Sequence, residues 1–397
     1  MTVCVGVEEE FHVLDPLSGL LAPRANAILS RLPRRGFTTE LQQSTVESNS
    51  GVHASLHDLY TDLVRSRRLL DTAASSQGLA VVAAGTVPLA GVAPVPATPD
   101  PRYRHMVDEY RAVADEQLIC GAQIHVDVPD RDTAVRLMCA VSPWLPPLLA
   151  LSASSPHWLG ADTGYASWRT MLWQRWPTAG PAGCFADAAE YNAHVRELIR
   201  SGVITDAGMI YYDVRPSAHQ QTLELRICDA CPRAETVVLI AGLFRALVTD
   251  AGRRLQASGG HQCPGRHEWL RAATWRAARS GLEGALIDPD TRRAAPAPTV
   301  VRAMLRKLRP ALEAQGDWST VLALTERTLA EGSAARRIRR IAREQDLLAC
   351  VDHLVAETRG ERRPPRPART AHRRIPPHGA VASAPRPVTG PVEAVGG

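Results

Sequence analysis

The segment QLICGAQIHVDV, residues 117–128, alternates apolar and polar side chains over most of its length. Successive side chains of a β-strand point to opposite faces of its sheet, so this alternation predicts a strand with one packed face and one polar face. The packed face consists of Cys120, Ala122, Ile124, Val126 and Val128. The polar face carries Gln123, His125 and Asp127.

Three further segments place acidic side chains, together with one His and one Arg, in or beside expected strands. These side chains are Glu8, Glu10 and His12 in VGVEEEFHV (residues 5–13), Glu224 and Arg226 in TLELRIC (222–228), and Glu40 and Glu47 in FTTELQQSTVESNSG (37–51). Carboxylates are unfavourable in the strands of a covered sheet, because an unpaired buried charge costs about 3 kcal/mol or more. A compensating cation is therefore expected near them.

The residue types indicate which cation this is. Mg²⁺ prefers oxygen ligands, and Mn²⁺ also accepts an imidazole. The predicted metal ligands are Glu8, Glu10, Glu47, His125 and Glu224. Such sites usually bind the metal together with substrate phosphates, and Arg226 lies two residues from Glu224 on the same face, where it can contact a phosphoryl oxygen.

The remaining pattern predicts an α+β fold, with helices covering a curved and mainly antiparallel sheet. MIYYDVRPS and QTLELRICD indicate a hairpin. Helical periodicity is expected over residues 53–76, 103–116, 132–152, 187–201, 234–257, 299–314, 318–330 and 334–357. Residues 1–358 are predicted to form one domain, and the Pro/Arg-rich residues 359–397 a disordered tail. Residues 88–101 are a Pro-rich loop or lid candidate.

Charge and hydropathy exclude several classes of protein. The net charge is +5, and residues 361–397 with seven Arg and two Glu account for it, so residues 1–360 are neutral. A nucleic acid partner is therefore not expected. The chain has no apolar run of membrane-spanning length and no basic segment at its start, which favours a cytoplasmic protein without a membrane partner. Association of identical chains stays open.

The eight cysteines have no framework spacing and are expected to be reduced thiols. Cys228 and Cys231 form a CxxC pair, but a second ligand pair for zinc is missing. Two partly buried thiols are the favoured interpretation.

Several long motifs resemble the glutamate-cysteine ligase type 2 family, also described as carboxylate-amine ligases. They lie between about residues 3 and 288: VGVEEEFHVLDP, ELQQSTVESNSGV, ICGAQIHVDV, LSASSPHWLGADTGYASWRTMLWQRWPTAG, TLELRICDACP and WRAARSGLEGALID. The resemblance implies a glutamine-synthetase-like catalytic fold that holds ATP and Mg²⁺. It implies the same five metal ligands, with Arg226 facing the γ-phosphoryl group as a nucleotide-binding and catalytic residue and Arg169 in the substrate region.

Three positions depart from the family pattern. GTHP reads GTVP with Val87, the first His of HVH is Gln123, and NRWRA reads ATWRA with Thr274. These departures concern the substrate side more than the metal side.

The expected function is an ATP-dependent ligase that forms an amide bond through an acyl phosphate, acts on a small carboxylate and a small amine, and resembles glutamate-cysteine ligase. Three alternatives stay open. They are an amide ligase of specialised metabolism, a catalytically silent nucleotide-binding protein, and a metal-dependent hydrolase that works without ATP.

Overall fold

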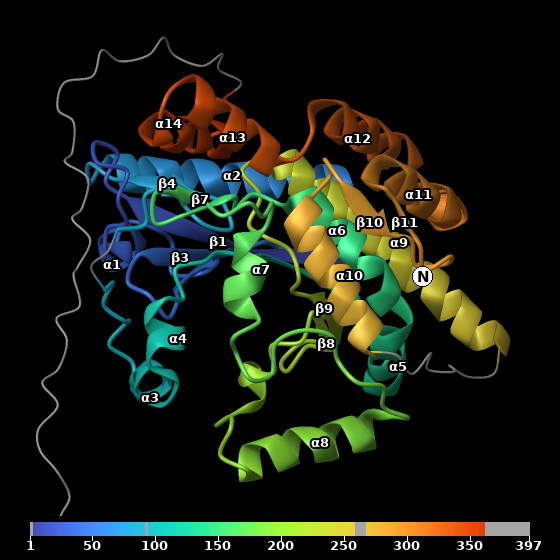
Figure 1. The fold of residues 1–397 in the computed structure, drawn as a ribbon. Helices are drawn as coiled ribbons and strands as arrows, with labels where there is room; N and C mark the ends of the chain where they lie inside the picture. Colours follow the sequence, from blue (N-terminus) through green and yellow to red (C-terminus); the bar gives the residue numbers. More distant parts are fainter. Residues whose placement is uncertain (1–2, 92–93, 259–266, 362–397) are drawn as a thin grey trace, which may run out of the picture. The chain divides into compact units, whose positions relative to one another are not determined.

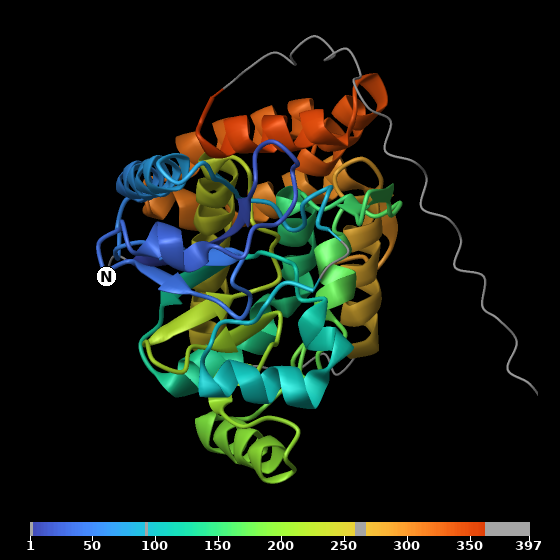
Figure 2. The same ribbon diagram turned by 90° about the vertical axis from the view of Figure 1, so that its left-hand side faces the viewer.

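The sheet at the centre of the fold joins strands that are far apart in the sequence (Figures 1 and 2). The computed structural model describes residues 3–91, 94–258 and 267–361. The strand order is β2-β3-β1-β5-β9-β8, β4 also pairs with β1, and every pairing is antiparallel. The strands are β1 (Val5–Leu14), β2 (Phe37–Thr39), β3 (Thr45–Asn49), β4 (Ala80–Val82), β5 (Ala122–Asp127), β8 (Val214–Pro216) and β9 (Thr222–Leu225). The predicted hairpin is β8 and β9.

Helices surround this sheet, so the predicted α+β class is confirmed. They are α1 (Ala25–Leu29), α2 (Leu56–Ser75), α3 (Pro101–Tyr110), α4 (Ala112–Asp115), α5 (Arg131–Val141), α6 (Leu145–Ser152), α7 (Trp168–Trp173), α8 (Ala188–Arg200), α9 (Ala234–Ser258), α10 (His267–Ser280), α11 (Ala297–Ala314), α12 (Trp318–Glu331), α13 (Ala334–Glu344) and α14 (Leu347–Thr358). Two small hairpins are β6 (His157–Trp158) with β7 (Ala161–Asp162) and β10 (Ala285–Ile287) with β11 (Ala294–Pro296).

The two faces of β1 have different partners. Its apolar side chains, such as Val7 and Phe11, are buried, and α2 and α9 pack against the strand. Glu9 lies among them, 1% exposed, and forms an ion pair with the buried Arg67 of α2. The helices therefore cover one face of the sheet, and the carboxylates of Glu8 and Glu10 are left for the other face.

Local chemistry explains where predicted helices end or divide. Ser55 caps α2 by accepting hydrogen bonds from the backbone N–H groups of His57 and Asp58. The predicted helix over 103–116 is interrupted at Arg111, whose φ of 50° breaks the helical backbone. The helix predicted over 334–357 divides into α13 and α14, because Asp346 caps a new helix by accepting from the N–H of Ala349.

Residues 131–152, which comprise α5, a short 3₁₀ turn and α6, are long and apolar enough to cross a membrane. However, 83% of their most apolar window is buried inside the protein. The segment packs against α9 and α10 as part of the core.

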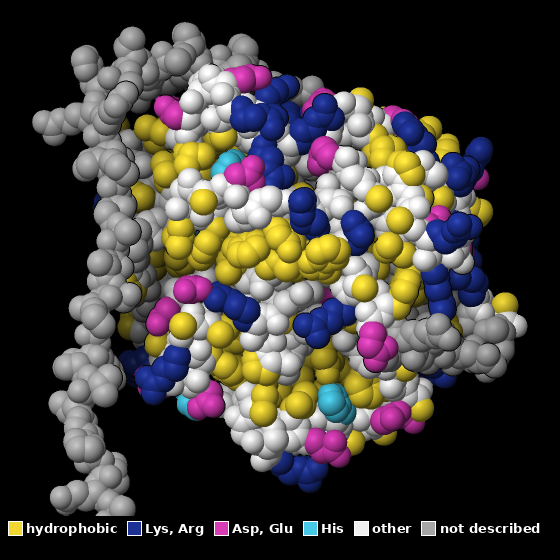
Figure 3. All heavy atoms as spheres, viewed as in Figure 1, with side chains coloured by type: hydrophobic (Ala, Val, Ile, Leu, Met, Phe, Trp, Pro, Cys, Tyr) yellow, Lys and Arg dark blue, Asp and Glu magenta, His cyan; other side chains and the backbone are white. Residues whose placement is uncertain are grey.

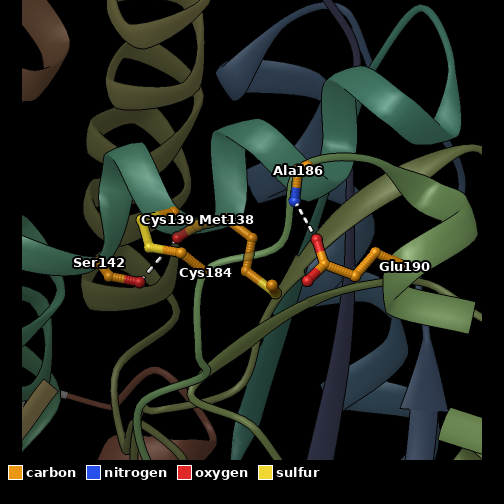
Figure 4. The surroundings of a disulfide bond; sticks show 6 residues. All are labelled: Met138, Cys139, Ser142, Cys184, Ala186 and Glu190. Carbon is orange, nitrogen blue, oxygen red and sulfur yellow. Dashed lines mark hydrogen bonds between the residues drawn. A yellow bond between two sulfur atoms is a disulfide. The ribbon is translucent and has the colours of Figure 1, made fainter. Parts of the chain in front are cut away.

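The expectation that all cysteines are reduced is wrong for one pair. Cys139 on α5 and Cys184, in the loop before α8, form a disulfide with a Cα–Cα distance of 5.7 Å (Figure 4). Their separation of 45 residues gave no indication of this pairing, which depends on how the loop lies over α5. Cys228 and Cys231 are free thiols, as expected, but they are fully rather than partly buried. Cys263 lies outside the described residues, as does the predicted tail from residue 362 onward.

Candidate active site

The strand register brings the predicted site residues into neighbouring rows on the open face of the sheet. Glu10 of β1 lies opposite Glu47 of β3, and Glu8 lies opposite Gln123 of β5. One row further, His125 of β5 lies opposite Glu224 of β9. Because side chains of directly paired residues project to the same face, the separate segments converge on one surface.

Two groups of three residues on this surface each offer ligand atoms within 4.8 Å of one another. The first group is Glu8, His125 and Glu224, and the second is Glu10, Glu40 and Glu47. All five predicted metal ligands belong to one group or the other. Glu40, which lies in the loop between β2 and β3, was not among them.

Among the residues that the structure describes, no Lys, Arg or His forms an ion pair with the Glu10, Glu40 and Glu47 group. Burial and the neighbouring Glu40 raise the pKa of Glu10 to about 7. Burial, Glu40 and Glu8 raise the pKa of Glu47 well above its ordinary value. The hydrogen bonds that these two carboxylates accept come from neutral groups: Gly121 N–H (2.6 Å) and Gln123 Nε2 (2.9 Å) to Glu10, and Asn49 Nδ2 (2.9 Å) to Glu47. A divalent cation would supply the missing positive charge, and the all-oxygen donor set suits Mg²⁺.

Glu224 is in a different electrostatic situation. Its carboxylate accepts hydrogen bonds from Arg215 Nε (2.8 Å) and Nη2 (3.2 Å) and from Arg226 Nη1. Burial alone would raise its pKa, but the two guanidinium groups lower the pKa of Glu224 to about 2. The negative charge of Glu224 is therefore already balanced by the two arginines, and its role as a metal ligand stays a prediction. His125, in the same group, forms a hydrogen bond between its Nδ1 atom and Thr222 Oγ1 (2.8 Å). Its Nε2 atom lies 3.2 Å from Glu8 Oε1.

Gln123 connects the acidic and basic parts of the site. Its amide N–H group donates to Glu10, and its carbonyl oxygen accepts from Arg226 Nη1 at 2.6 Å. The Arg226 guanidinium also lies over the rings of Trp173 and Tyr211, at 5.8 and 6.0 Å from their centroids. An Arg held on several sides in this way keeps one orientation, as a group that contacts a phosphoryl oxygen must.

Arg169 of α7 is a buried guanidinium with no carboxylate bonded to it in the part of the chain that the structure describes. It donates to the carbonyl oxygens of Ile227 (3.2 Å) and Arg226 (3.4 Å), and its Nε atom has no partner. It passes so close to Gly121 that any side chain there would collide with it. Its backbone N–H donates to Ser155 Oγ, which in turn donates to the buried Asp229.

Most of these residues line one cavity of about 240 Å³, but His125 and Glu224 are not part of its lining. Its acidic side is formed by β1, β3 and the Glu40 loop, and its other walls carry Trp173, Trp176 and Tyr211. Arg102 of α3 also lines the cavity but is paired with Asp206 at 2.8 Å. The predicted Pro-rich loop supports the acidic side, because Thr98 N–H donates to Leu41 O and Gln43 N–H donates to Pro96 O.

Of the three departures from the family pattern, Gln123 lines the cavity. Val87 is fully buried in an apolar cluster with Leu118 and Ile338, and Thr274 is buried within α10.

His12, which shares a face with Glu8 and Glu10, lies further along β1 where the strand pairs with β4. Burial lowers the pKa of His12 to about 4, so it packs as a neutral side chain.

Sequence reasoning missed Glu40 and Arg215 as site residues. Glu40 lies in the same motif as Glu47, and its carboxylate was the one feature of the sequence that could have marked it as a possible metal ligand. Arg215 lies in the expected hairpin directly opposite Glu224, so pairing the two strands in register would have found it.

A buried carboxyl beside the site predicts a pH dependence of stability. Burial raises the pKa of Asp213, the residue before β8, to about 7. The folded protein therefore binds this proton more tightly than the unfolded chain, and the free energy of unfolding should fall as pH rises from about 4 to 7. In denaturant titrations, the Asp213→Asn variant should lose this decrease in the free energy of unfolding with pH. Its free energy of unfolding should exceed that of the wild type most clearly above pH 7. Parallel profiles of both proteins would contradict the assignment.

Comparison with known proteins shows the family. Residues 4–357 match the family model described as glutamate-cysteine ligase family 2. A Frankia alni protein with the provisional name glutamate–cysteine ligase 2-3 is 54% identical over 358 residues, covering 90% of this chain but 42% of its own length. A Mycolicibacterium smegmatis protein with the provisional name glutamate–cysteine ligase 2-2 is 51% identical and is covered over 89% of its length. The chain thus spans less than half of some relatives and most of others.

Solved structures share the fold at low sequence identity. The glutamate–cysteine ligase of Francisella tularensis, in complex with AMP, superposes with a TM-score of 0.67 at 11% identity, covering 90% of this chain and 89% of that one. A bifunctional glutathione synthetase from Pasteurella multocida gives 0.66 at 15% identity, covering 90% of this chain and 52% of that one. On the match of the family model over nearly all of the described residues, the chain belongs to glutamate-cysteine ligase family 2.

Proposed function

We propose that this protein is an ATP-dependent carboxylate-amine ligase. The observation that carries the proposal is one cavity in which an uncompensated carboxylate group faces firmly held arginines. ATP chemistry needs both parts, because phosphates bind through divalent cations and through guanidinium groups. Membership of glutamate-cysteine ligase family 2 supports the same reaction class.

Glu10, Glu40 and Glu47 are the residues that would hold Mg²⁺, with Glu8 and His125 as a second set beside Glu224. Bound Mg²⁺ would neutralise the phosphate charge of ATP. Arg226 would face the γ-phosphoryl group and stabilise its charge during transfer to the acid substrate. The acid then becomes an acyl phosphate, and the amine displaces phosphate to leave an amide.

Arg169 would bind a second anionic group of the acid substrate, one that does not react. This guanidinium lines the cavity without a bonded carboxylate from the described residues, whereas Arg102, Arg215 and Arg226 each have one. Leaving a buried charge unpaired is unfavourable, so a substrate carboxylate would restore the balance. This favours a dicarboxylic acid such as glutamate, with cysteine as the first amine to test.

Arg169→Lys tests this assignment. Lysine keeps the charge but loses the fork of donors, so we expect KM for the acid to rise by about tenfold or more while kcat changes little. Arg102→Lys, in the same cavity but paired with Asp206, is the matched control and should change KM less. Equal effects of the two substitutions would argue against a substrate role for Arg169.

The function itself is tested by phosphate release from ATP and Mg²⁺ in the presence of paired acids and amines, beginning with glutamate and cysteine, followed by the mass of the product. Release that requires both substrates supports a ligase. Turnover of a substrate without ATP would support a hydrolase instead, and ATP binding without release for any pair would support a silent homologue. A different pair would identify a specialised ligase, which Gln123 in the cavity favours.

A further inference from the structure

A second cavity, of about 570 Å³, lies away from the residues described above, where the loop before α9 meets α12, α13 and α14. We call it the arginine cavity. It is lined by Arg233, Ala330, Glu331, Arg336, Arg337, Arg340, Arg343, His353, Glu357 and Glu361. Its volume falls within the range of about 300–1,000 Å³ that is usual for small-molecule sites. Lys and Arg side chains gather over α13 at the top of the space-filling view (Figure 3).

Two of its five arginines are engaged by a buried acid. Glu357 is 4% exposed and accepts from Arg337 Nε (2.9 Å) and Nη2 (3.0 Å) and from Arg233 Nε (2.8 Å). Burial alone would raise the pKa of Glu357, but His353, Arg337 and Arg233 hold it well below its usual range. This ionised network forms a rigid base for the cavity. Arg233 and Arg337 balance the negative charge of Glu357.

The other three arginines have no carboxylate partner within residues 3–91, 94–258 and 267–361. Arg336, Arg340 and Arg343 are exposed and lie at positions i, i+4 and i+7 of α13, so they share one face of the helix. By contrast, Arg339 of the same helix points elsewhere and pairs with Asp162 at 2.6 Å. Like charges at this spacing repel one another, and an anion in the cavity would relieve that repulsion.

The spacing of the three arginines selects the kind of anion. With a rise of 1.5 Å per residue, they extend over about 10 Å of helix. A single phosphate cannot reach all of them, whereas a chain of phosphates can, and guanidinium groups bind phosphate oxygens in pairs. We propose that the arginine cavity is a binding site for an oligophosphate anion, such as free triphosphate or the phosphate chain of a nucleotide. The site is separate from the catalytic cavity.

Isothermal titration calorimetry with inorganic tripolyphosphate tests the proposal on the full chain. The buffer contains EDTA and no Mg²⁺, so that the acidic catalytic cavity repels the probe. We expect wild-type protein to bind tripolyphosphate at least tenfold more tightly than orthophosphate. Arg340→Ala with Arg343→Ala should weaken tripolyphosphate binding at least tenfold. These side chains are exposed, and unchanged thermal unfolding will show that the variant is folded.

The matched control removes two other exposed arginines, Arg306→Ala on α11 and Arg327→Ala on α12, which lie on neighbouring helices outside the cavity. All variants keep the seven arginines of residues 362–397, so their contribution is constant. The control should bind within threefold of the wild type. No heat with wild-type protein, equal binding by the Arg340/Arg343 variant, or equal weakening by the control would overturn the proposal. Titration with ATP in the same buffer then distinguishes a nucleotide from a free phosphate chain.

Discussion

Glu10→Gln is expected to lower kcat/KM for phosphate release by at least about 100-fold while the protein stays folded. Glu10 belongs to the carboxylate group that lacks a compensating charge, and burial raises its pKa to about 7. Glutamine has the size of the protonated acid but keeps one of the two oxygens that accept from Gly121 and Gln123, so the metal-free protein should lose only a little stability. The substitution would remove a negative ligand of the proposed Mg²⁺ site, and with it the cation that would neutralise the phosphates of ATP.

Two measurements check this prediction. Steady-state phosphate release gives the activity, and thermal unfolding with and without Mg²⁺ gives the stability. Mg²⁺ should stabilise the wild type and stabilise Glu10→Gln less, because cation binding to the folded state is linked to stability. Wild-type turnover in the variant would show that the acidic cavity is not the reaction centre.

Glu9→Gln, one residue away, should have the opposite effect. Glu9 binds Arg67 through both carboxylate oxygens, at 2.5 and 3.2 Å, and the two side chains are 1% and 4% exposed. Arg67 also donates to the carbonyl oxygens of Cys231 and Pro232. Removing the carboxylate leaves a buried guanidinium without its counter-charge, which costs about 3–5 kcal/mol.

Denaturant unfolding measures this loss, and kcat/KM per folded molecule at low temperature should stay within a few-fold of the wild type. Replacing Arg67 by Met in the Glu9→Gln background serves as the control, because it removes the stranded charge and should recover part of the stability. An unfolding midpoint unchanged by Glu9→Gln would contradict the assigned ion pair. On one face of β1, Glu10 is thus expected to affect activity, and on the other face Glu9 is expected to affect stability.

Much of the site followed from short-range patterns. Alternation along Val5–Val13 and residues 117–128 identified Glu8, Glu10 and His125 as members of polar faces, since side-chain direction in a strand depends on its neighbours alone. Family motifs added Arg169. The helix over 53–76 was recognisable for the same local reason, an apolar stripe at helical spacing.

Other features depend on distant segments and could not be read in the same way. Glu40 reaches the acidic group from a loop that Thr98 supports. Cys139 and Cys184 meet across 45 residues. The helices α7 and α10 were not expected, because α7 is short and α10 lacks a clear apolar period. These segments are helical because they pack against the core.

By itself the sequence determined which side chains share a face and which chemical groups are present, because strand alternation and ligand preference act over a few residues. The tertiary structure alone decided which charges are balanced. Arg215 and Arg226 neutralise Glu224 and Arg67 neutralises Glu9, whereas Glu10, Glu40 and Glu47 have no ion-pair partner within the described part of the chain. Those pairings arise from strand register and from helices packed across the sheet. Electrostatic energy depends on distance and burial, which exist only after the chain has folded.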